Sequence, residues 1–347
     1  MDRRYALKSL AAISAGSLLS GHGLQSANAS RYTPAWQNAI DKGLNWLAKE
    51  QSPRGRWVSA QRTYPTAMTA LGGTALLASG STTTQGPYAK KIRLAIDYLM
   101  TKVRKNGLIG DPLTDNRYTY GHGFAMLFLS QVLGEEEDKE RREELTAVLE
   151  KAVEFSGRAQ TKSGGWGYMS AKEGSNFDEG STTITQVQGL RGCRNAGIPV
   201  SKEIIDKAKQ YIYMCKNPDG GISYSSKNRG SSRPAITAAS LASLYNAGDY
   251  DSKHVPEMME YCKKNLHRVE SQSFGHWHYT YLYYAQVVYR EGGESWTGFR
   301  EKLYNKIVKE QGDNGGWKNA SFGNSYASAI NLTVLQLDKG ILPIYQR

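Results

Sequence analysis

KGLNWLAKEQSPRGRW, Lys42–Trp57, is the stretch of this 347-residue sequence that decides its fold. Leu44 and Leu47 are three residues apart, as apolar residues are on one face of an amphipathic helix. Gln51 follows, then a loop that contains Pro and Gly, which are typical turn residues, and finally Trp57. The stretch therefore predicts a helix that ends near the glutamine and a turn that is covered by the tryptophan.

The same arrangement, with Gln six residues before Trp, occurs three times. Its further copies are KAVEFSGRAQTKSGGW at Lys151–Trp166 and KLYNKIVKEQGDNGGW at Lys302–Trp317. Lys207–Ile222 has the same spacing, but Lys216 replaces the Gln and Ile222 replaces the Trp. A weaker copy surrounds Gly107. A Gln amide can bond to the unpaired groups at a helix end, and Trp offers a large apolar face. We therefore expect a structural staple that recurs along the chain.

Charged and uncharged segments alternate along the sequence. Six segments are charged and amphipathic, as surface helices are: Ala35–Glu50, Lys90–Lys105, Glu135–Arg158, Ser201–Lys216, Ser252–Arg268 and Trp296–Gln311. Six others contain no Asp, Glu, Lys or Arg, as buried helices would: Thr63–Ala89, Tyr118–Gly134, Ser181–Leu190, Pro234–Gly248, His276–Tyr289 and Ala320–Leu337. The alternation predicts an all-α fold, an (α/α)6 toroid or barrel of six outer and six inner helices. An open solenoid is the alternative, but its end repeats would need polar caps.

Residues 1–29 have the layout of a secretory signal peptide. Arg3 and Arg4 precede a mildly apolar run, and Ala27–Ala29 offers small residues for cleavage. Paired arginines are typical of the bacterial twin-arginine route. We expect an exported protein, periplasmic or extracellular, with residues 30–347 as one domain and no transmembrane segment. The net charge of +12 favours an anionic partner, whereas the export signal argues against nucleic acid.

With these repeats the sequence resembles the squalene cyclases and the β subunits of protein prenyltransferases. Their QW motif places Gly-x-Trp after a Gln of an outer helix. The resemblance covers Ala35 to Arg347 and extends to bacterial exported prenyltransferase and squalene oxidase repeat proteins. Stretches typical of those proteins match Tyr120–Gly123, Ser232–Ala235, Phe274–His276 and Leu342–Arg347. The resemblance implies an α/α toroid with a central cavity for an isoprenoid-like ligand.

The resemblance does not extend to the known chemistry of that superfamily. Squalene cyclases protonate their substrate with an Asp-x-Asp-Asp-Thr motif, and Asp178–Thr182 has Gly180 and Ser181 where the paired acids belong. Prenyltransferases hold zinc with Asp, Cys and His, and no Asp-rich magnesium motif is present either. We expect no metal and no cofactor, and catalysis stays an open question. The three cysteines are expected to be small buried residues: Cys193, Cys215 and Cys262.

Candidate ligand-binding residues lie where the inner helices begin, because these N-termini ring one mouth of a toroid and carry partial positive charge. The candidates for catalysis are His122, Asp178, Arg233 and His276. The candidates for ligand binding are Arg117, Tyr118, Tyr120, Tyr224, His278, Tyr279 and Tyr283. Structural roles compete with these: packing for His122, helix capping for Asp178 and a loop tie for Arg233. Glu179 is expected to be solvated.

Three classes of function stay open on the sequence alone. The first is a toroid that binds an isoprenoid-like ligand, with or without converting it. The second is an acidic-polysaccharide lyase or glycan-binding toroid, with Tyr and His as base and acid; a glycosidase would need two carboxylates, such as Asp115 and Asp178. The third is a non-catalytic protein-interaction scaffold. A deep apolar cavity favours the first, a wide polar groove the second and a filled centre the third.

Overall fold

The computed structural model describes residues 32–346 except residues 175 and 271–275. The chain divides into two compact units, Met1–Thr33 and Pro34–Arg347. Only Tyr32 and Thr33 of the first unit are described, so the predicted signal peptide lies outside the described residues. The same is true of residues 274 and 275 in one of the family-like stretches. Every helix of the described residues lies in the second unit.

Helices of two kinds alternate in the described part of the chain, as the charge pattern predicts. The outer helices are α1 (Pro34–Glu50), α3 (Ala89–Met100), α5 (Lys139–Ala159), α7 (Lys202–Cys215), α9 (His254–Asn265) and α12 (Gly293–Lys309). The inner helices are α2 (Pro65–Leu77), α4 (Tyr118–Leu133), α6 (Gly180–Asn195), α8 (Pro234–Asn246), α11 (His276–Glu291) and α13 (Asn324–Leu335). Three short helices complete them: α10 (His267–Glu270), η2 (Leu337–Lys339) and η3 (Pro343–Tyr345).

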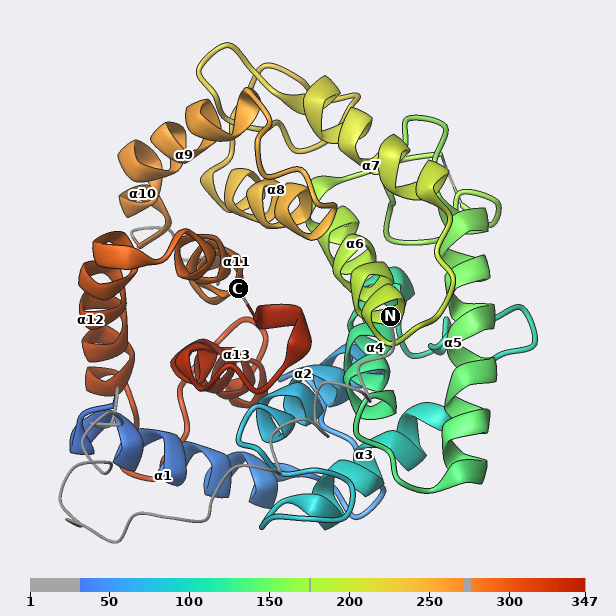
Figure 1. Ribbon diagram of the computed structural model, residues 1–347, viewed down its shortest axis with the longest axis vertical. Coiled ribbons are helices and arrows are strands. Elements are labelled where there is room, and N and C mark those ends of the chain that lie inside the picture. Colours follow the sequence, from blue (N-terminus) through green and yellow to red (C-terminus); the bar gives the residue numbers. More distant parts are fainter. Residues whose placement is uncertain (1–31, 175, 271–275, 347) are drawn as a thin grey trace, which may run out of the picture. The chain divides into compact units, whose positions relative to one another are not determined.

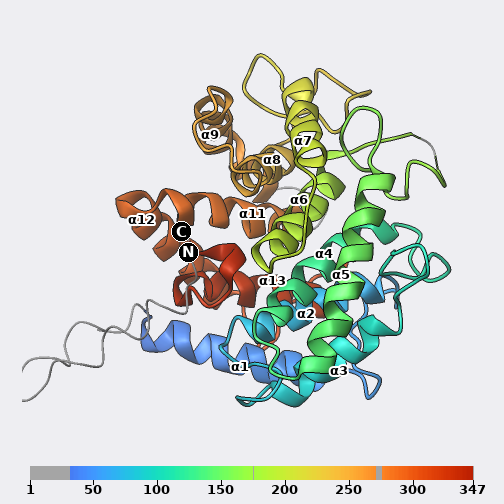
Figure 2. The same cartoon turned by 45° about the vertical axis from the view of Figure 1, so that its right-hand side comes forward.

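The inner helices form a closed ring inside the outer ones (Figure 1). Each inner helix contacts the next, and α13 contacts α2, which closes the ring. Figure 2 shows α5 and α7 lying outside α4 and α6. The predicted all-α toroid is therefore confirmed, and this closure excludes the open solenoid.

Burial follows the two sequence patterns. Every residue of the uncharged helix α2 is buried, whereas α1 buries a stripe that includes Ile40 and Leu44. Small residues let the inner helices approach closely, since a Cβ on Gly123 of α4 would lie 2.6 Å from the carbonyl carbon of Thr185 in α6. Among the described residues, no helix is long and apolar enough to cross a membrane. The three cysteines are free and buried, as expected.

Gln51 and Trp57 hold the end of α1 to its neighbours. The Gln51 Nε2 donates to the carbonyl of Gly55 in its own loop at 2.9 Å and to that of Lys91 in α3 at 2.8 Å. The indole N–H of Trp57 donates to the carbonyl of Leu47 at 2.9 Å, and the side chain is buried. One amide thus joins two successive outer helices while the tryptophan fixes the turn to the helix that it leaves.

The other two copies repeat this geometry. Gln160 at the end of α5 donates to the carbonyl of Ile204 in α7 at 2.9 Å. Gln311 after α12 donates to the carbonyl of Ala39 in α1 at 2.8 Å. Because α1 is the first outer helix and α12 the last, this third staple closes the outer ring.

The complete and the degenerate copies of the staple share a glycine in the loop that follows the outer helix. These glycines have φ between +82° and +92°, a left-handed conformation that L side chains rarely adopt. A Cβ at any of them would meet a backbone carbonyl oxygen of the next outer helix at 2.0 to 2.6 Å. They are Gly55, Gly107, Gly164, Gly220 and Gly315. The loop therefore approaches the next outer helix closely even in the degenerate copies, where other residues replace Gln and Trp.

The C-terminal segment fills one end of the ring. The Ile344 N–H donates to Gln131 Oε1 near the end of α4 at 3.2 Å, and its carbonyl accepts from Arg290 near the end of α11 at 3.0 Å. Ile344 and Tyr345 are buried. This segment thus packs against the C-terminal ends of α4 and α11.

Candidate functional site

A cavity of about 610 Å³ lies among the N-terminal halves of the inner helices. Every inner helix contributes to its wall: Met68 and Leu71 (α2), Tyr120 and Phe124 (α4), Ser181 (α6), Ile236 (α8), Tyr279 and Leu282 (α11), and Tyr326 and Ile330 (α13). Small-ligand pockets typically measure about 300–1,000 Å³. The centre is therefore neither filled nor a wide groove, and a ligand there would face the positive ends of the inner helices.

The inner wall of the cavity is apolar and aromatic. Met68, Leu282 and Ile330 are buried side chains that reach it from three different helices. The Tyr279 hydroxyl donates to the carbonyl of Ser181 at 3.3 Å. That hydroxyl is bonded within the protein, so the ring is what Tyr279 offers to a ligand.

Two arginines lie at the mouth of the cavity, each over a tyrosine ring. The Cζ atom of Arg117 is 4.3 Å from the ring centroid of Tyr168, and that of Arg233 is 5.2 Å from the ring centroid of Tyr224. The hydroxyls of Tyr168 and Tyr224 are hydrogen-bonded to each other, which joins both pairs into one unit. Both arginines are exposed, and neither has a carboxylate partner in the described part of the chain. Stacking leaves the N–H donors at the edges of the guanidinium groups available for an anion.

Glu179 is a buried carboxylate behind this wall. Its Oε1 accepts from the hydroxyl of Tyr120 at 3.0 Å, and its Oε2 accepts from the N–H of Ser181 at 2.9 Å. Burial raises the pKa of Glu179, and hydrogen bonds from Ser181, Thr182 and Tyr120 act in the opposite direction. The expectation that Glu179 is solvated is wrong, because its side chain caps the N-terminus of α6 and is 0% exposed. It also orients Tyr120 in the cavity wall.

The cavity brings together part of the predicted set. Its wall contains Arg117, Tyr120, Tyr224, Arg233, His276 and Tyr279. Burial and, secondarily, the charge of Arg233 lower the pKa of His276. Among the described residues, no Asp or Glu lines the cavity.

His122 lies outside the cavity wall. Its Nδ1 accepts from the N–H of Ile109 at 3.1 Å, which leaves Nε2 to donate to the carbonyl of Ala152 in α5 at 3.1 Å. The ring packs edge-on against Phe155 at 4.9 Å and is 0% exposed. Burial lowers the pKa of His122 to about 4. This histidine joins an inner helix to an outer one in its neutral form.

Asp178 also lies away from the cavity. It accepts from the N–H and the hydroxyl of Ser226, each at 2.9 Å, and is 0% exposed. It therefore ties one loop to another, and the capping role expected of it belongs to Glu179.

Three further predicted residues have partners elsewhere or lie deeper than the wall. The hydroxyl of Tyr118 accepts from the N–H of Ser170 at 2.8 Å, and burial raises its pKa. His278 Nδ1 lies 3.3 Å from the side-chain amide of Asn319, and burial lowers the pKa of this histidine to about 4. Tyr283 packs edge-on against Tyr279 at 4.9 Å and is 0% exposed.

Sequence reasoning missed several residues of the wall. Tyr168 follows the staple residue Trp166 by two positions, and Tyr326 lies in the first turn of α13. Tyr64 immediately precedes α2 and has φ of +52°, a conformation that is uncommon outside glycine and concentrates at functional sites. The signal that could have found them is position, since each lies next to or within the first turn of an uncharged helix or beside a staple.

Asp115 has an unpaired oxygen inside the protein. Its Oδ1 accepts from the N–H of Arg117 at 3.2 Å, while its buried Oδ2 has no partner among the described residues. Burial raises the pKa of Asp115 to about 6. Neither Asp115 nor Asp178 lines the cavity, so the two do not form a carboxylate pair across it.

Asp115→Asn is expected to stabilise the protein by about 2 kcal/mol at pH 7.5 and not at pH 4. The folded protein holds this proton more tightly than the unfolded chain, so stability falls as pH rises from about 4 to about 6. Asparagine keeps the acceptor for the Arg117 N–H and removes the buried charge. Urea unfolding at both pH values measures the difference. Exposed Asp313→Asn is the control, and an equal gain at both pH values would contradict the assignment.

The chain has no match to a family model and none to a curated protein. Solved structures do share its fold. The type II terpene cyclase MstE from Scytonema is 14% identical with a TM-score of 0.60, over 89% of this chain and 99% of that one. The GH76A α-1,6-mannanase from Salegentibacter sp. HEL1_6 is 8% identical with a TM-score of 0.63, over 88% and 99%. A family 76 glycoside hydrolase from a bovine Bacteroides thetaiotaomicron strain is 10% identical with a TM-score of 0.61, over 88% and 77%.

These similarities define the class of protein. It is an α/α toroid of the kind found in a terpene cyclase and in family 76 glycoside hydrolases. Identities of 8–14% show the fold alone, because one fold hosts many activities. The fold therefore leaves the function open, and the lining of the cavity is the evidence that bears on it.

Proposed function

We propose that this protein binds, in its central cavity, an amphiphilic ligand with an isoprenoid-like apolar body and an anionic group. The observation that carries the proposal is the pair Arg117 and Arg233, stacked on tyrosines at the mouth of an apolar, aromatic cavity. The two parts of the wall match the two parts of such a ligand.

The inner wall supports an apolar body. Burial of one methylene group contributes about 0.8 kcal/mol, so each five-carbon isoprene unit would contribute roughly 3–4 kcal/mol before the cost of association. Flexible Met68 and the aromatic rings of Phe124 and Tyr279 can adapt to a branched, unsaturated chain.

The mouth supports the anionic group. A guanidinium group offers several N–H donors in a plane and matches a carboxylate or phosphate. No acidic side chain lines the cavity among the described residues, so the charges of Arg117 and Arg233 are not neutralised there. The inner-helix N-termini add partial positive charge in the same place.

Two structures that share the fold are described with ligands of different classes. MstE is described in complex with its substrate, geranylgeranyl dihydroxybenzoate, which joins an isoprenoid chain to a benzoate. The GH76A mannanase is described with α-1,6-mannotriose. Glycosidases cleave with two opposed carboxylates, and none faces the described part of this cavity. The isoprenoid class is therefore favoured over a glycosidase.

Calorimetric titration of the full chain with geranylgeranyl phosphate tests the proposal. One molecule is expected to bind per chain. Geranylgeraniol, which lacks the anion, should bind at least about tenfold more weakly, because a charged hydrogen bond contributes about 1.5–3 kcal/mol. Geranylgeranyl trimethylammonium, the control for unspecific adsorption, should bind more weakly still. Failure of both geranylgeranyl phosphate and the alcohol to bind, or equal affinity for the two, would contradict the proposal.

We also propose that the protein acts after export, because the start of the sequence has the layout of a twin-arginine signal. Replacement of Arg3 and Arg4 by lysine in a fusion of residues 1–35 to a periplasmic reporter is expected to abolish most export. Fractionation of bacterial cells measures it. Unchanged export of the lysine variant would show that another route is used.

A further inference from the structure

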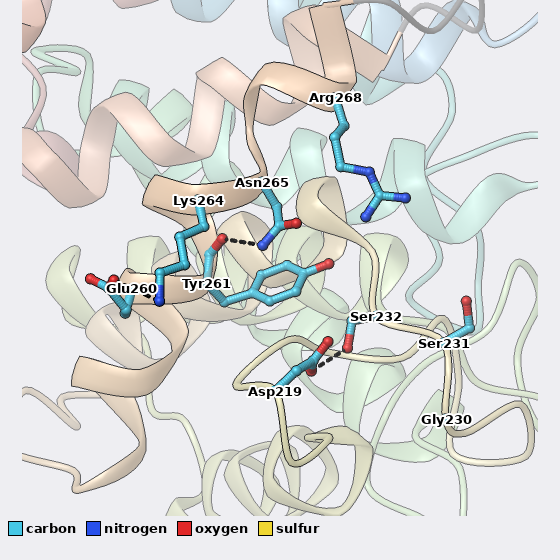
Figure 3. Close-up of a pocket in the computed structure, with 9 residues that line it drawn as sticks. All are labelled: Asp219, Gly230, Ser231, Ser232, Glu260, Tyr261, Lys264, Asn265 and Arg268. Carbon is cyan, nitrogen blue, oxygen red and sulfur yellow. Dashed lines mark hydrogen bonds and ion pairs between the residues drawn. The ribbon is translucent and has the colours of Figure 1, made fainter.

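A second hollow, of about 590 Å³, lies between the loop of residues 216–233 and helices α9 and α10 (Figure 3). We call it the polar cleft. Ser231, Ser232 and Arg268 belong both to its wall and to that of the central cavity. The two spaces are therefore adjacent and share these three residues as a common wall.

We propose that the polar cleft holds an uncharged, hydroxyl-rich group, such as a sugar, of the same ligand whose apolar body lies in the central cavity. The inference rests on the proposed function and specifies it further. The ligand class becomes an isoprenoid phosphate that carries a sugar.

The charges of the cleft favour a neutral group. Asp219 and Glu260 face it together with Lys264 and Arg268, so the formal charges of its side chains cancel. An anion would meet two carboxylates there and a cation would meet two basic groups. A hydroxyl both donates and accepts, and it can use acceptors and donors side by side. The side-chain amide of Asn265 adds one more acceptor and one more donor group to the cleft.

Hydrogen bonds and close packing hold the loop side of the cleft in place. The Ser232 hydroxyl donates to Asp219 Oδ1 at 2.7 Å and accepts from the side-chain amide of Asn217 at 2.8 Å. Gly221 packs so closely that a Cβ there would lie 2.3 Å from Ser232 Cβ and 2.7 Å from Tyr261 Cε2. Figure 3 shows Asp219 and Ser232 on one side of the cleft and the α9 side chains on the other. Such preorganisation lowers the cost of binding.

The order of the residues gives the order of the ligand's parts. Ser232 of the cleft is followed directly by Arg233 of the cavity mouth. A phosphate at Arg233 would therefore lie next to a group in the cleft, while the apolar body extends to the inner wall. A sugar esterified to the phosphate of an isoprenoid has its parts in the same order: sugar, phosphate and apolar chain.

The test compares geranylgeranyl phosphate with geranylgeranyl phosphoglucose, in which glucose is esterified to the phosphate, by calorimetry on the full chain. The wild type is expected to bind the glucose-bearing lipid about tenfold more tightly, as two or three added hydrogen bonds would produce. Asn265→Ala removes an amide from the cleft. Ser231→Trp fills the place where the cleft borders the central cavity. Each substitution alone should abolish this gain. Asn265→Ala should leave the affinity for geranylgeranyl phosphate unchanged. Lys263→Ala on the same helix, outside the cleft, is the control and should retain the gain.

The outcomes separate the two proposals. Equal affinity of the wild type for both lipids would overturn the role of the cleft and leave the proposed function intact. Equal weakening of both lipids by Asn265→Ala would also overturn it, because the cleft would then be part of the general mouth. Failure of both lipids to bind would overturn the proposed function, and this inference with it.

Discussion

Trp166→Ala is expected to lower the free energy of unfolding by about 3–5 kcal/mol, the largest single effect on stability that the staples predict. The Trp166 side chain is 0% exposed, and its indole N–H donates to the carbonyl of Ser156 at 2.8 Å. Its backbone N–H donates to the hydroxyl of Thr183 in α6 at 3.2 Å, so the residue joins an outer helix to an inner one. Truncation leaves a void and an unpaired carbonyl.

Urea unfolding followed by far-ultraviolet circular dichroism measures this loss. Trp277→Ala is the matched control. Trp277 is only partly buried, and its indole nitrogen has no partner among the described residues. Trp277→Ala should lower the free energy of unfolding by less than half as much as Trp166→Ala. Equal losses for the two variants would mean that the staple adds nothing beyond ordinary burial of a tryptophan.

Replacement of both Arg117 and Arg233 by glutamine is expected to weaken binding of geranylgeranyl phosphate about 100-fold. Each guanidinium would contribute one or more charged hydrogen bonds to the anion, and loss of one such bond typically costs about 1.5–3 kcal/mol. Glutamine keeps a polar side chain and removes the charge. Binding of geranylgeraniol should change by less than about threefold, because the alcohol lacks the anion.

Titration calorimetry of the double variant with both lipids measures these changes. The control replaces exposed Arg54 and Arg194 by glutamine, which removes the same net charge away from the cavity. It should leave both affinities unchanged. A loss below about threefold for the phosphate, or an equal loss for the alcohol, would show that the arginines do not bind the anionic group.

The fold was predictable because its signals are local and repeated. Absence of charge marks most of each inner helix, with charged residues only in the last turns of α6 and α11, and one apolar stripe marks the outer helices. The glycine of each loop was the less visible signal. Gly107 and Gly220 keep the left-handed turn without Gln or Trp beside them, and only the close approach of the next helix explains why.

The location of the candidate cavity was predictable, and the residues that line it were less so. Tyr120 and His122 are two positions apart on α4, and on a helix such residues point to different sides. Tyr120 lines the cavity and His122 packs against α5. Capping was expected of Asp178 and exposure to solvent of Glu179. Because α6 begins at Gly180, the residue directly before it, Glu179, is the one that caps the helix. Tyr168 lies in a loop, where no periodicity indicates a direction.

Photo-crosslinking with geranylgeranyl phosphate that carries a diazirine on its last isoprene unit tests most directly whether the ligand lies inside the ring. One adduct per chain is predicted, in peptides that contain Leu71 of α2, Leu282 of α11 or Ile330 of α13. An excess of unlabelled geranylgeranyl phosphate should abolish it. Adducts confined to outer helices, or adducts that the unlabelled lipid does not compete away, would contradict binding in the central cavity.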